Sequence, residues 1–458
     1  MNIYMQVEVS LRELDSKLLL ATLAAAKGHQ VIVSDLSEIN RGLKRKLLMP
    51  GIFHTKSLTP NDKKLALHKE MINKGFVITS IDEEAGLSDQ GYDEMARERY
   101  SNESIEQSSA VFGWGQEDTE TLQKTYSKHS SKIYKTGSPR VDLWTSLFSE
   151  YWGVPKAKPL RPFLLVPSNM LFSNKITFHE NIKMHRILGY FDRDPKKFAW
   201  LFKKNAEDGL MTLAFIEAIK YLAKNNQKFD IVLRPHPAEN IDAWKIYLEN
   251  ISNVHVLQEG PITAWVNNCF AIMHNGCTTA LEAAFSGKPV ITYMPFKQEY
   301  SKQLANQIGY IVKSRDELLQ KINTIFKNSQ LSKIEKLNEE LPKLISNKVY
   351  YDKKELAAEK IIKVWENFNS DKLSQKSNWT KFELILRALE FKDNIWRILQ
   401  KISPNKFRSY KDNKKFPPLD KTYIYKQIIK IKNILGIKED LEYKLLSKRA
   451  LLIRRKNK

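Results

Sequence analysis

The sequence predicts an α/β protein with two Rossmann-like domains followed by a basic helical tail. Short apolar runs alternate with amphipathic segments in two successive series, which is typical of strands and helices in parallel-sheet domains. A charged, proline-containing stretch at 153–162 separates the two series, and the C-terminal residues follow neither. The 458 residues exceed one ordinary core but suit two domains of roughly 150 to 200 residues each. We therefore expect domains at 1–155 and 161–368, and a tail at 372–458.

The first series predicts a sheet of parallel strands with helices between them. A helix over 16–27 is expected to end at Gly28. The expected strands are 3–9, 30–34, 76–81, 110–114 and 132–136. Strands that alternate with helices imply a single sheet with right-handed crossover connections.

The second series predicts another domain of the same kind. Its expected strands are 163–166, 230–233, 254–257, 271–274 and 289–293. Helices are expected over 209–225, 278–285 and 353–368, and the last of them closes the domain.

The positive charge is concentrated in the tail. The chain has a formal net charge of +22, from 74 Lys and Arg and 52 Asp and Glu. Residues 372–458 contain 24 of these basic residues and 8 of the acidic ones, a balance of +16. The rest of the chain is nearly neutral, which argues against nucleic acid as a partner, because a nucleic-acid-binding domain carries its positive face on the folded body.

Two apolar stripes predict basic amphipathic helices in the tail. One consists of Ile424, Ile428, Ile431 and Leu435, and the other of Phe382, Ile385, Leu386 and Leu389, with Trp396 and Leu399 extending it. Helices of this kind bind anionic membrane surfaces, which is the partner we favour for the tail. The alternatives are a helical bundle that packs its stripes on the body and an arm that binds a protein partner.

Composition also bears on cofactors and location. Cys269 and Cys277 are too few for a disulfide scaffold or a four-thiolate zinc site, and the nine histidines include no pair spaced i, i+4. We therefore expect no metal or other cofactor. The start lacks the basic segment of a secretion signal, and no stretch approaches the ~20 apolar residues that span a bilayer. We expect a cytoplasmic protein that is peripheral at the inner face of the plasma membrane.

The segment from 273 to 292 contains the most specific pattern. A strand ends at Asn275 and Gly276, and Thr278 and Thr279 open the next helix. Free backbone amides at such a helix start, together with two hydroxyl groups, are suited to binding a phosphate. Glu282 lies one turn further along and could accept hydrogen bonds from sugar hydroxyl groups. The alternative is that Thr278 only caps the helix and that Glu282 is solvated.

A second polar segment, Arg234-Pro-His-Pro237, directly follows an expected strand. Ligands of open α/β sheets bind at the carboxyl ends of the strands. The two prolines restrict the loop, so Arg234 and His236 are placed to bind a diphosphate or the charge of a leaving group. The loop 167–174, which contains Ser168 and Asn169, is also expected to line a cleft between the domains.

The first domain has carboxylates in comparable places. Asp82, Glu83 and Glu84 follow the expected strand 76–81, and one of them could act as the general base that deprotonates an acceptor hydroxyl. The alternative is an acidic first turn of the next helix. Glu8, Arg12 and Glu13 follow the first strand and raise the same question, and Arg140 is a further candidate for the cleft.

Three segments resemble the nucleotide-binding half of GT-B glycosyltransferases. They are Arg234-Pro-His-Pro237, Asn275-Gly-Cys-Thr-Thr-Ala-Leu-Glu-Ala283 and Gly287-Lys-Pro-Val-Ile291. The similarity is greatest to bacterial capsule and lipopolysaccharide enzymes that use CMP- or CDP-activated donors. The His-Pro pair resembles the motif with which polysialyltransferases and teichoic-acid glycerophosphotransferases hold the nucleotide phosphate. The acidic residues 82–84 resemble their catalytic motif, although Ala85 precedes Gly86.

Segments of the first domain resemble the surface carbohydrate biosynthesis proteins. They are Val7-Glu-Val-Ser-Leu-Arg-Glu-Leu-Asp15, Ile81-Asp-Glu-Glu84, Phe112-Gly-Trp-Gly115 and Thr136-Gly-Ser-Pro-Arg-Val-Asp142, and the resemblance extends over about residues 1–365. It implies a GT-B architecture with two domains facing a cleft and a role in assembling O-antigen or another surface glycan. The implied donor is a CMP-linked acidic sugar, such as Kdo or another nonulosonic acid.

These observations predict a metal-independent glycosyltransferase that acts on a glycan or lipid-linked acceptor. Its donor would contact Ser168, Asn169, Arg234, His236, Asn275, Gly276, Thr278, Thr279 and Glu282. Glu83 or Asp82 would be the base, with Glu8 as a further catalytic candidate and Arg12 and Arg140 nearby. The alternatives are an enzyme resembling UDP-N-acetylglucosamine 2-epimerase and a non-catalytic scaffold of a glycan-assembly complex.

Overall fold

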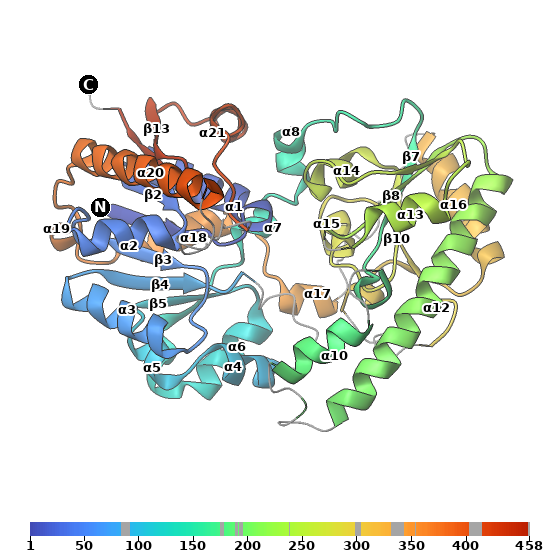
Figure 1. Cartoon of the computed structure of the whole chain (residues 1–458), viewed down its shortest axis with the longest axis horizontal. Helices are drawn as coiled ribbons and strands as arrows, with labels where there is room; N and C mark the ends of the chain where they lie inside the picture. Colours follow the sequence, from blue (N-terminus) through green and yellow to red (C-terminus); the bar gives the residue numbers. More distant parts are fainter. Residues whose placement is uncertain are drawn as a thin grey trace. The chain divides into compact units, whose positions relative to one another are not determined.

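The computed structural model describes residues 1–83, 92–174, 178–187, 191, 196–237, 239–297, 304–330, 343–352, 354–402 and 415–456. The chain forms two compact units, each with its own sheet (Figure 1). Unit 1 comprises Met1–Leu143 and Lys343–Lys458, and unit 2 comprises Trp144–Pro342. These bounds differ from the expected domains because the chain after residue 342 returns to unit 1.

Unit 1 contains an eight-stranded sheet with the order β13-β14-β2-β1-β3-β4-β5-β6. Neighbouring strands from β1 to β6 pair in parallel, whereas β14 pairs with both β2 and β13 in antiparallel fashion. The strands are β1 (Asn2–Gln6), β2 (Gln30–Ser34), β3 (Ile52–Thr55), β4 (Val77–Ile81), β5 (Ala110–Gly113), β6 (Ile133–Lys135), β13 (Leu441–Ser447) and β14 (Ala450–Arg455).

Helices pack on this sheet in two groups. Helix α1 contacts α7, α18 and α21, and α20 contacts α2 and β13. The helices are α1 (Ser10–Ala26), α2 (Leu36–Lys44), α3 (Asp62–Asn73), α4 (Tyr92–Arg99), α5 (Asn102–Glu106), α6 (Gln116–Thr125), α7 (Pro139–Asp142), α17 (Lys343–Lys348), α18 (Ala357–Glu366), α19 (Ser370–Leu373), α20 (Trp379–Ile402) and α21 (Lys421–Ile434). Local caps begin several of them: the Asp35 carboxylate, for example, accepts the Glu38 N–H at the start of α2 (3.1 Å).

Unit 2 contains a parallel six-stranded sheet with the order β12-β11-β10-β7-β8-β9. Runs such as FLLVP and DIVLR are buried along their whole length, as expected of strands covered on both faces. The strands are β7 (Phe163–Pro167), β8 (Asp230–Arg234), β9 (Val254–Val256), β10 (Ala271–His274), β11 (Val290–Tyr293) and β12 (Tyr310–Val312). The helices are α8 (Ser149–Trp152), α9 (Leu171–Asn174), α10 (Phe178–Ile187), α12 (Lys196–Asn225), α13 (Ile241–Tyr247), α14 (Ile262–Asn268), α15 (Thr279–Phe285) and α16 (Arg315–Gln330).

This topology confirms the predicted fold class of α/β with two Rossmann-like units. Each sheet also has a topological switch point, where the chain order of the strands reverses and ligands of open α/β sheets bind. In unit 1 it lies between β1 and β3, and in unit 2 it lies between β7 and β10.

The C-terminal segment differs from the expected tail. Residues 379–402 and 415–455 add two helices and a hairpin to unit 1, so the first and last parts of the chain lie together there (Figure 1). Ile424, Ile428 and Ile431 are fully buried on α21, which packs on α1. This stripe therefore covers the body, as the bundle alternative proposed, and is not available to a membrane.

The other predicted stripe is buried at its start and exposed at its end along α20. Phe382 and Leu386 are buried in the unit 1 core, together with Trp379 from the same helix. Beyond them, the predicted members Trp396 and Leu399 are exposed. The hairpin that follows α21 pairs with β2, which would otherwise present an open edge of unpaired N–H and C=O groups.

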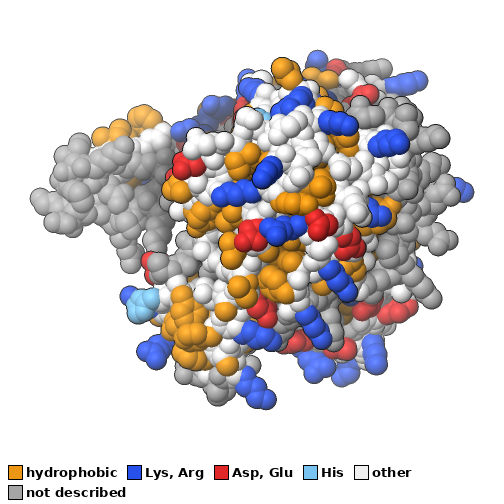
Figure 2. All heavy atoms as spheres, turned by 90° about the vertical axis from the view of Figure 1, so that its right-hand side faces the viewer, with side chains coloured by type: hydrophobic (Ala, Val, Ile, Leu, Met, Phe, Trp, Pro, Cys, Tyr) orange, Lys and Arg blue, Asp and Glu red, His pale blue; other side chains and the backbone are white. Residues whose placement is uncertain are grey.

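Charged side chains of both signs are mixed on the face of the molecule seen in Figure 2. On the face shown in Figure 2, Lys and Arg side chains are interspersed with Asp, Glu and hydrophobic side chains. Among the described residues, no helix has the length and hydropathy needed to cross a membrane.

Candidate functional site

The loops after β7 and β10 meet at the switch point of unit 2. The Asn169 side-chain amide donates to the Gly276 carbonyl at 2.9 Å, so one hydrogen bond joins the two loops. Gly276 has φ +63°, a conformation that glycine adopts without strain. Its N–H donates to Asn306 Oδ1 at 2.6 Å. These bonds hold the corner from which α15 begins.

The start of α15 leaves one backbone donor open. Thr278 occupies the N-cap position, but its hydroxyl makes no capping bond and its residue is exposed. The Thr278 N–H has no hydrogen-bond partner among the residues that the structure describes, whereas the Thr279 N–H donates to the Cys277 sulfur. Thr279 itself is buried, and its hydroxyl accepts a contact from Cys277 Sγ at 3.2 Å. The alternative in which Thr278 only caps the helix is therefore wrong.

Asn275 and Glu282 are buried on either side of this corner. Asn275 Nδ2 donates to the Tyr293 carbonyl at 2.9 Å, which ties the loop after β10 to β11. Glu282 accepts a hydrogen bond from the Thr263 hydroxyl at 2.7 Å. The alternative of a solvated Glu282 is wrong, because the side chain lies between α14 and α15 and its orientation is fixed there.

A glutamate that the sequence did not single out organises the loop after β7. The buried Glu239 carboxylate accepts hydrogen bonds from Ser168 Oγ (2.7 Å), the Met170 N–H (2.8 Å) and Trp244 Nε1 (2.6 Å). Three donors offset the cost of removing a carboxylate from water. Ser168 is thus part of the scaffold of this loop.

Arg234 has a different surrounding from the one expected. Its guanidinium is buried, donates to the carbonyls of Glu259 and Gly260, and stacks over the Trp265 ring with 5.1 Å to the centroid. Burial lowers the pKa of the guanidinium to about 10. Arg234 therefore fixes the loop after β9, which makes it a positioning residue instead of a direct phosphate ligand.

The backbone of His236 is held by hydrogen bonds, whereas its side chain is exposed. Its carbonyl accepts from the Glu239 N–H at 2.8 Å and from Gln258 Nε2 at 3.1 Å. The residue itself is exposed at the end of β8. This places an imidazole at the same sheet edge as the open Thr278 N–H.

In unit 1 the candidate bases are held in ion pairs. The Lys17 ammonium lies 2.7 Å from Glu83 Oε1, and these side chains are only 2% and 3% exposed. Asp82 Oδ2 accepts from Arg99 Nε at 2.6 Å, and its backbone carbonyl accepts from Trp114 Nε1. Both carboxylates are therefore poorly placed to take a proton from an acceptor, contrary to the expectation for Glu83 and Asp82. Glu84 lies outside the described residues.

Glu8 is the more accessible carboxylate, with its side chain 33% exposed. It pairs with Lys56 and with Lys415, the latter at 3.1 Å. Burial acts to raise the pKa of Glu8, but the hydrogen bonds and charges of the two lysines outweigh it and hold that pKa below its ordinary value. Glu8 is therefore an ionised acceptor at neutral pH.

The two arginines expected near this site support neighbouring groups. Arg12 pairs with the buried Glu13 at 3.0 Å, and Glu13 in turn accepts the Glu8 N–H at 2.7 Å. Arg140 donates to the Glu83 carbonyl at 3.1 Å and lies over the Trp114 ring. Within the described residues, no three His, Cys, Asp or Glu side chains form a group that could hold a metal ion.

No protein-family model and no curated protein matches the chain. Similar solved structures include a Listeria monocytogenes protein assigned as a UDP-N-acetylglucosamine 2-epimerase, with a TM-score of 0.49 and 12% identity over 80% of this chain and 95% of that one. They also include a glycosyltransferase from Rickettsia africae (TM-score 0.44, 12% identity, 82% and 99% coverage). A third is the UDP-GlcNAc 2-epimerase of Neisseria meningitidis bound to UDP-GlcNAc (TM-score 0.43, 13% identity, 80% and 99% coverage). At these TM-scores and identities the matches assign no activity to this chain.

Proposed function

We propose that this protein is a glycosyltransferase of bacterial surface-glycan assembly, in either O-antigen or capsule, that binds a nucleotide-activated sugar in unit 2. The observation that carries the proposal is the corner at the β7/β10 switch point, where the Thr278 N–H remains open beside the exposed Thr278 hydroxyl. Hydrogen bonds to Gly276 fix the corner before any ligand arrives. Such prearranged donors are suited to the phosphate of a nucleotide.

Some of the remaining residues would contact the nucleotide, and others would hold the loops around it. The exposed His236 ring would approach the phosphate, and Glu282 would face the ribose, while Asn169, Asn275 and Arg234 hold the loops. The donor we favour is a CMP-linked acidic sugar such as Kdo, because of the resemblance of the Arg234-Pro-His-Pro237 segment to cytidine-nucleotide enzymes. Neutralisation of the leaving phosphate by N–H groups and an imidazole would not require a metal.

Unit 1 would bind the acceptor, and Glu8 is the base that its geometry favours. Glu83 and Asp82 are buried with Lys17 and Arg99, whereas Glu8 reaches solvent at the carboxyl end of β1. Glu8 would remove the proton from an acceptor hydroxyl, whose oxygen then attacks the anomeric carbon. The bond from that carbon to the phosphate breaks, and the nucleotide leaves with both electrons.

Calorimetry of the full chain with CMP, CDP and UDP tests the donor site. We expect a cytidine nucleotide to bind, and Thr278→Val to weaken it about tenfold or more, because a hydrogen bond to a charged group contributes about 1.5–3 kcal/mol. Thr324→Val, at an exposed threonine of α16, is the matched control. If no nucleotide binds, the donor proposal is wrong. If Thr278→Val binds as the wild type does, the phosphate lies elsewhere.

Turnover separates this function from its alternatives. Release of CMP or CDP only when a glycan acceptor is added supports transfer. Isomerisation of a UDP-sugar without acceptor would instead identify a 2-epimerase. Nucleotide binding without any turnover would favour the scaffold.

We further propose that α20 docks the protein on the anionic inner face of the plasma membrane, close to a lipid-linked acceptor. The helix exposes an apolar stripe at helical spacing, and Lys381, Arg387 and Lys392 are exposed on the same helix. The stripe consists of Leu384 (64% exposed), Phe391 (68%), Ile395 (42%) and Ile398 (58%). Exposed large apolar side chains beside cations are suited to the interface of an anionic bilayer.

Co-sedimentation with vesicles tests this surface. We expect binding to phosphatidylglycerol-containing vesicles, weak binding to phosphatidylcholine alone, and loss of binding in Phe391→Ser/Ile395→Ser/Ile398→Ser. Leu210→Ser/Leu213→Ser, at two comparably exposed leucines of α12, is the matched control. Unchanged binding by the α20 variant would show that α20 is not the docking surface.

A further inference from the structure

A pocket of about 400 Å³ opens between α2 and α3 of unit 1. Gln6 at the end of β1 and Thr55 at the end of β3 line it, so it lies at the switch point of the unit 1 sheet. Thr55 Oγ1 donates to Gln6 Oε1 at 2.8 Å, which joins the two strand ends beneath the opening. All of the residues that line the pocket belong to unit 1.

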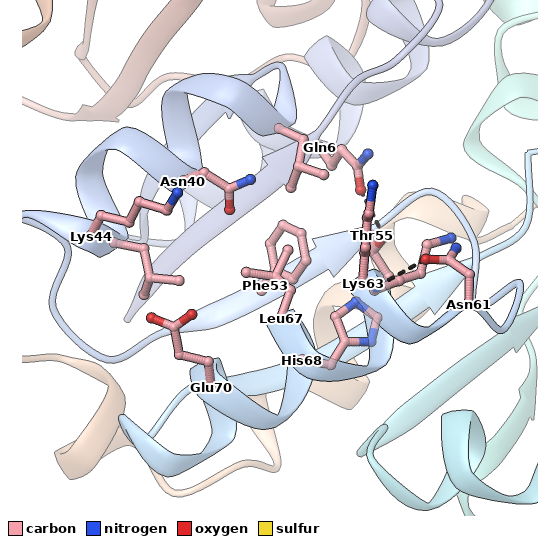
Figure 3. A pocket seen from close by; sticks show the side chains of 13 residues that line it. Gln6, Asn40, Lys44, Phe53, Thr55, Asn61, Lys63, Leu67, His68 and Glu70 are labelled. Atoms are coloured by element: carbon pink, nitrogen blue, oxygen red, sulfur yellow. Dashed lines mark hydrogen bonds between the residues drawn. The ribbon is translucent and has the colours of Figure 1, made fainter.

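The floor of the pocket is apolar. Leu43 and Phe53 are buried core residues, and Leu67 packs against the same core from α3. Figure 3 shows the Phe53 ring and Leu67 between the two helices. This surface favours a ligand with an apolar group of a few carbon atoms.

Two buried polar atoms at the walls have no partner. His68 is 1% exposed, and neither its Nδ1 nor Asn40 Oδ1 forms a hydrogen bond among the described residues. Figure 3 shows the Asn40 amide extending from α2 and the His68 ring from α3 toward the space between them. A buried polar atom without a partner is costly, so a ligand that supplies a hydrogen bond to it gains affinity. Burial lowers the pKa of His68 to about 4, and the ring is therefore neutral at neutral pH.

The rim of the pocket is basic. Lys44 and Lys63 are exposed at the opening, whereas Lys64 donates to Ser57 Oγ at 3.0 Å. Glu70 is the rim carboxylate, and it is paired with Lys74 at 2.7 Å. The two exposed lysines can therefore attract an anion at the opening while the floor excludes charge.

We infer that this pocket binds an acylamido sugar that carries an acidic group. The acyl methyl would lie on Phe53 and Leu67, an N–H or hydroxyl of the sugar would donate to Asn40 Oδ1, and a phosphate or carboxylate would meet Lys44 and Lys63. The inference rests on the proposed function in one respect, that the bound sugar is part of the glycan acceptor.

Calorimetry of the nucleotide-free full chain tests the ligand chemistry. The probes are N-acetylglucosamine 1-phosphate and N-acetylneuraminic acid, which share an acylamido group and an acidic group. We expect at least one of them to bind in the millimolar range or tighter. N-acetylglucosamine, which lacks the acid, and glucose 1-phosphate, which lacks the acyl group, should bind several-fold more weakly. Equal binding of all four sugars, or binding of neither probe, would overturn the inference.

Variants locate the binding in this pocket. Asn40→Leu and Lys44→Ala/Lys63→Ala should each weaken the probe at least fivefold, whereas Lys69→Ala, at an exposed lysine outside the pocket on α3, should not. His68→Phe is a second test. It should weaken binding of the probe, and it should not lower the thermal stability, because the His68 Nδ1 forms no hydrogen bond among the described residues that the variant would lose. If none of these variants changes the affinity, the site is wrong.

The nucleotide affinity of the same variants distinguishes the two proposals. A chain that binds a cytidine nucleotide but neither acidic sugar retains the proposed function and loses this inference. A chain that binds an acidic sugar at the pocket but no nucleotide retains the site and loses its assignment as the acceptor site.

Discussion

The carboxyl edges of the two sheets hold their charged groups in different ways. In unit 1 each candidate carboxylate faces a cation: Glu83 faces Lys17, Asp82 faces Arg99, and Glu8 faces two lysines. In unit 2 the buried Glu239 is held by a hydroxyl, a backbone amide and an indole. The candidate carboxylates of unit 1 are therefore already paired, whereas the start of α15 in unit 2 keeps an open N–H that an incoming anion can use.

The difference teaches where substrate charge is expected. A carboxylate that is already paired with a cation gains little from a charged reacting group, but an ionised one can accept the proton of a hydroxyl. An unpaired backbone donor gains most from an anion. The assignment of the nucleotide to unit 2 and the hydroxyl acceptor to unit 1 follows from this contrast.

The largest effect is expected at the buried ion pair of unit 1. Lys17→Met should lower the free energy of unfolding by about 3–5 kcal/mol, because it leaves the Glu83 charge buried without a partner. The double variant Lys17→Met/Glu83→Gln should recover most of that loss. Urea unfolding measures both. Lys27→Met, which breaks the exposed pair with Glu366, is the control and should cost less than about 1 kcal/mol. If Lys17→Met also costs less than about 1 kcal/mol, the Lys17–Glu83 pair does not stabilise unit 1 as a buried ion pair.

An intermediate effect is expected at Glu239 of unit 2. Glu239→Gln replaces an acceptor oxygen by an amide donor, so at least one of its three partners loses its bond. We expect a loss of about 1–3 kcal/mol in thermal unfolding, accompanied by weaker nucleotide binding because the loop carrying Ser168 and Asn169 is released. Glu249→Gln, at an exposed residue after α13, should change neither. A loss of stability with unchanged nucleotide affinity would show that this loop does not contribute to nucleotide binding.

Much of the fold could be predicted from the sequence, because the strands are short apolar runs with clear ends. β2 and β10 occupy the predicted residues, 30–34 and 271–274. β3 (Ile52–Thr55) was missed because its four residues include a histidine and a threonine. β13 and β14 were missed because residues 372–458 as a whole were interpreted as a basic helical tail, to whose charge Lys444, Arg454 and Arg455 contribute. A periodic stripe indicates that a helix has an apolar face but not which surface covers that face.

The candidate site was predicted less completely, for a related reason. The segment around Thr278 was recognisable because its glycine, hydroxyl residues and helix are contiguous in sequence. The roles of Glu83 and Glu239 depend on Lys17 and Ser168, which are 66 and 71 residues away. Local patterns identify such residues as candidates, but only the fold shows whether a carboxylate is exposed or already paired.

The smallest effect is expected at Glu8, the accessible carboxylate of unit 1. Its pKa is held below the ordinary value of 4.5 in the folded protein, so the folded state keeps the charge at pH values where the unfolded chain takes up a proton. The stabilisation is therefore present above that ordinary value and is lost as the pH falls through the lower, folded pKa. Since the side chain is one-third exposed, we expect Glu8→Gln to cost less than about 1 kcal/mol at pH 7.

Urea unfolding of wild type and Glu8→Gln at pH 7, and again below the ordinary pKa, tests this expectation. The difference between the two proteins should shrink at the lower pH, and high salt at pH 7 should reduce it as well, because exposed pairs are screened. Lys415→Ala should remove part of the same difference, since Lys56 remains as a partner. A difference that is independent of both pH and salt would mean that Glu8 contributes through packing. The charge pairing that distinguishes unit 1 from unit 2 would then be confined to the buried carboxylates of unit 1, Glu83 and Asp82.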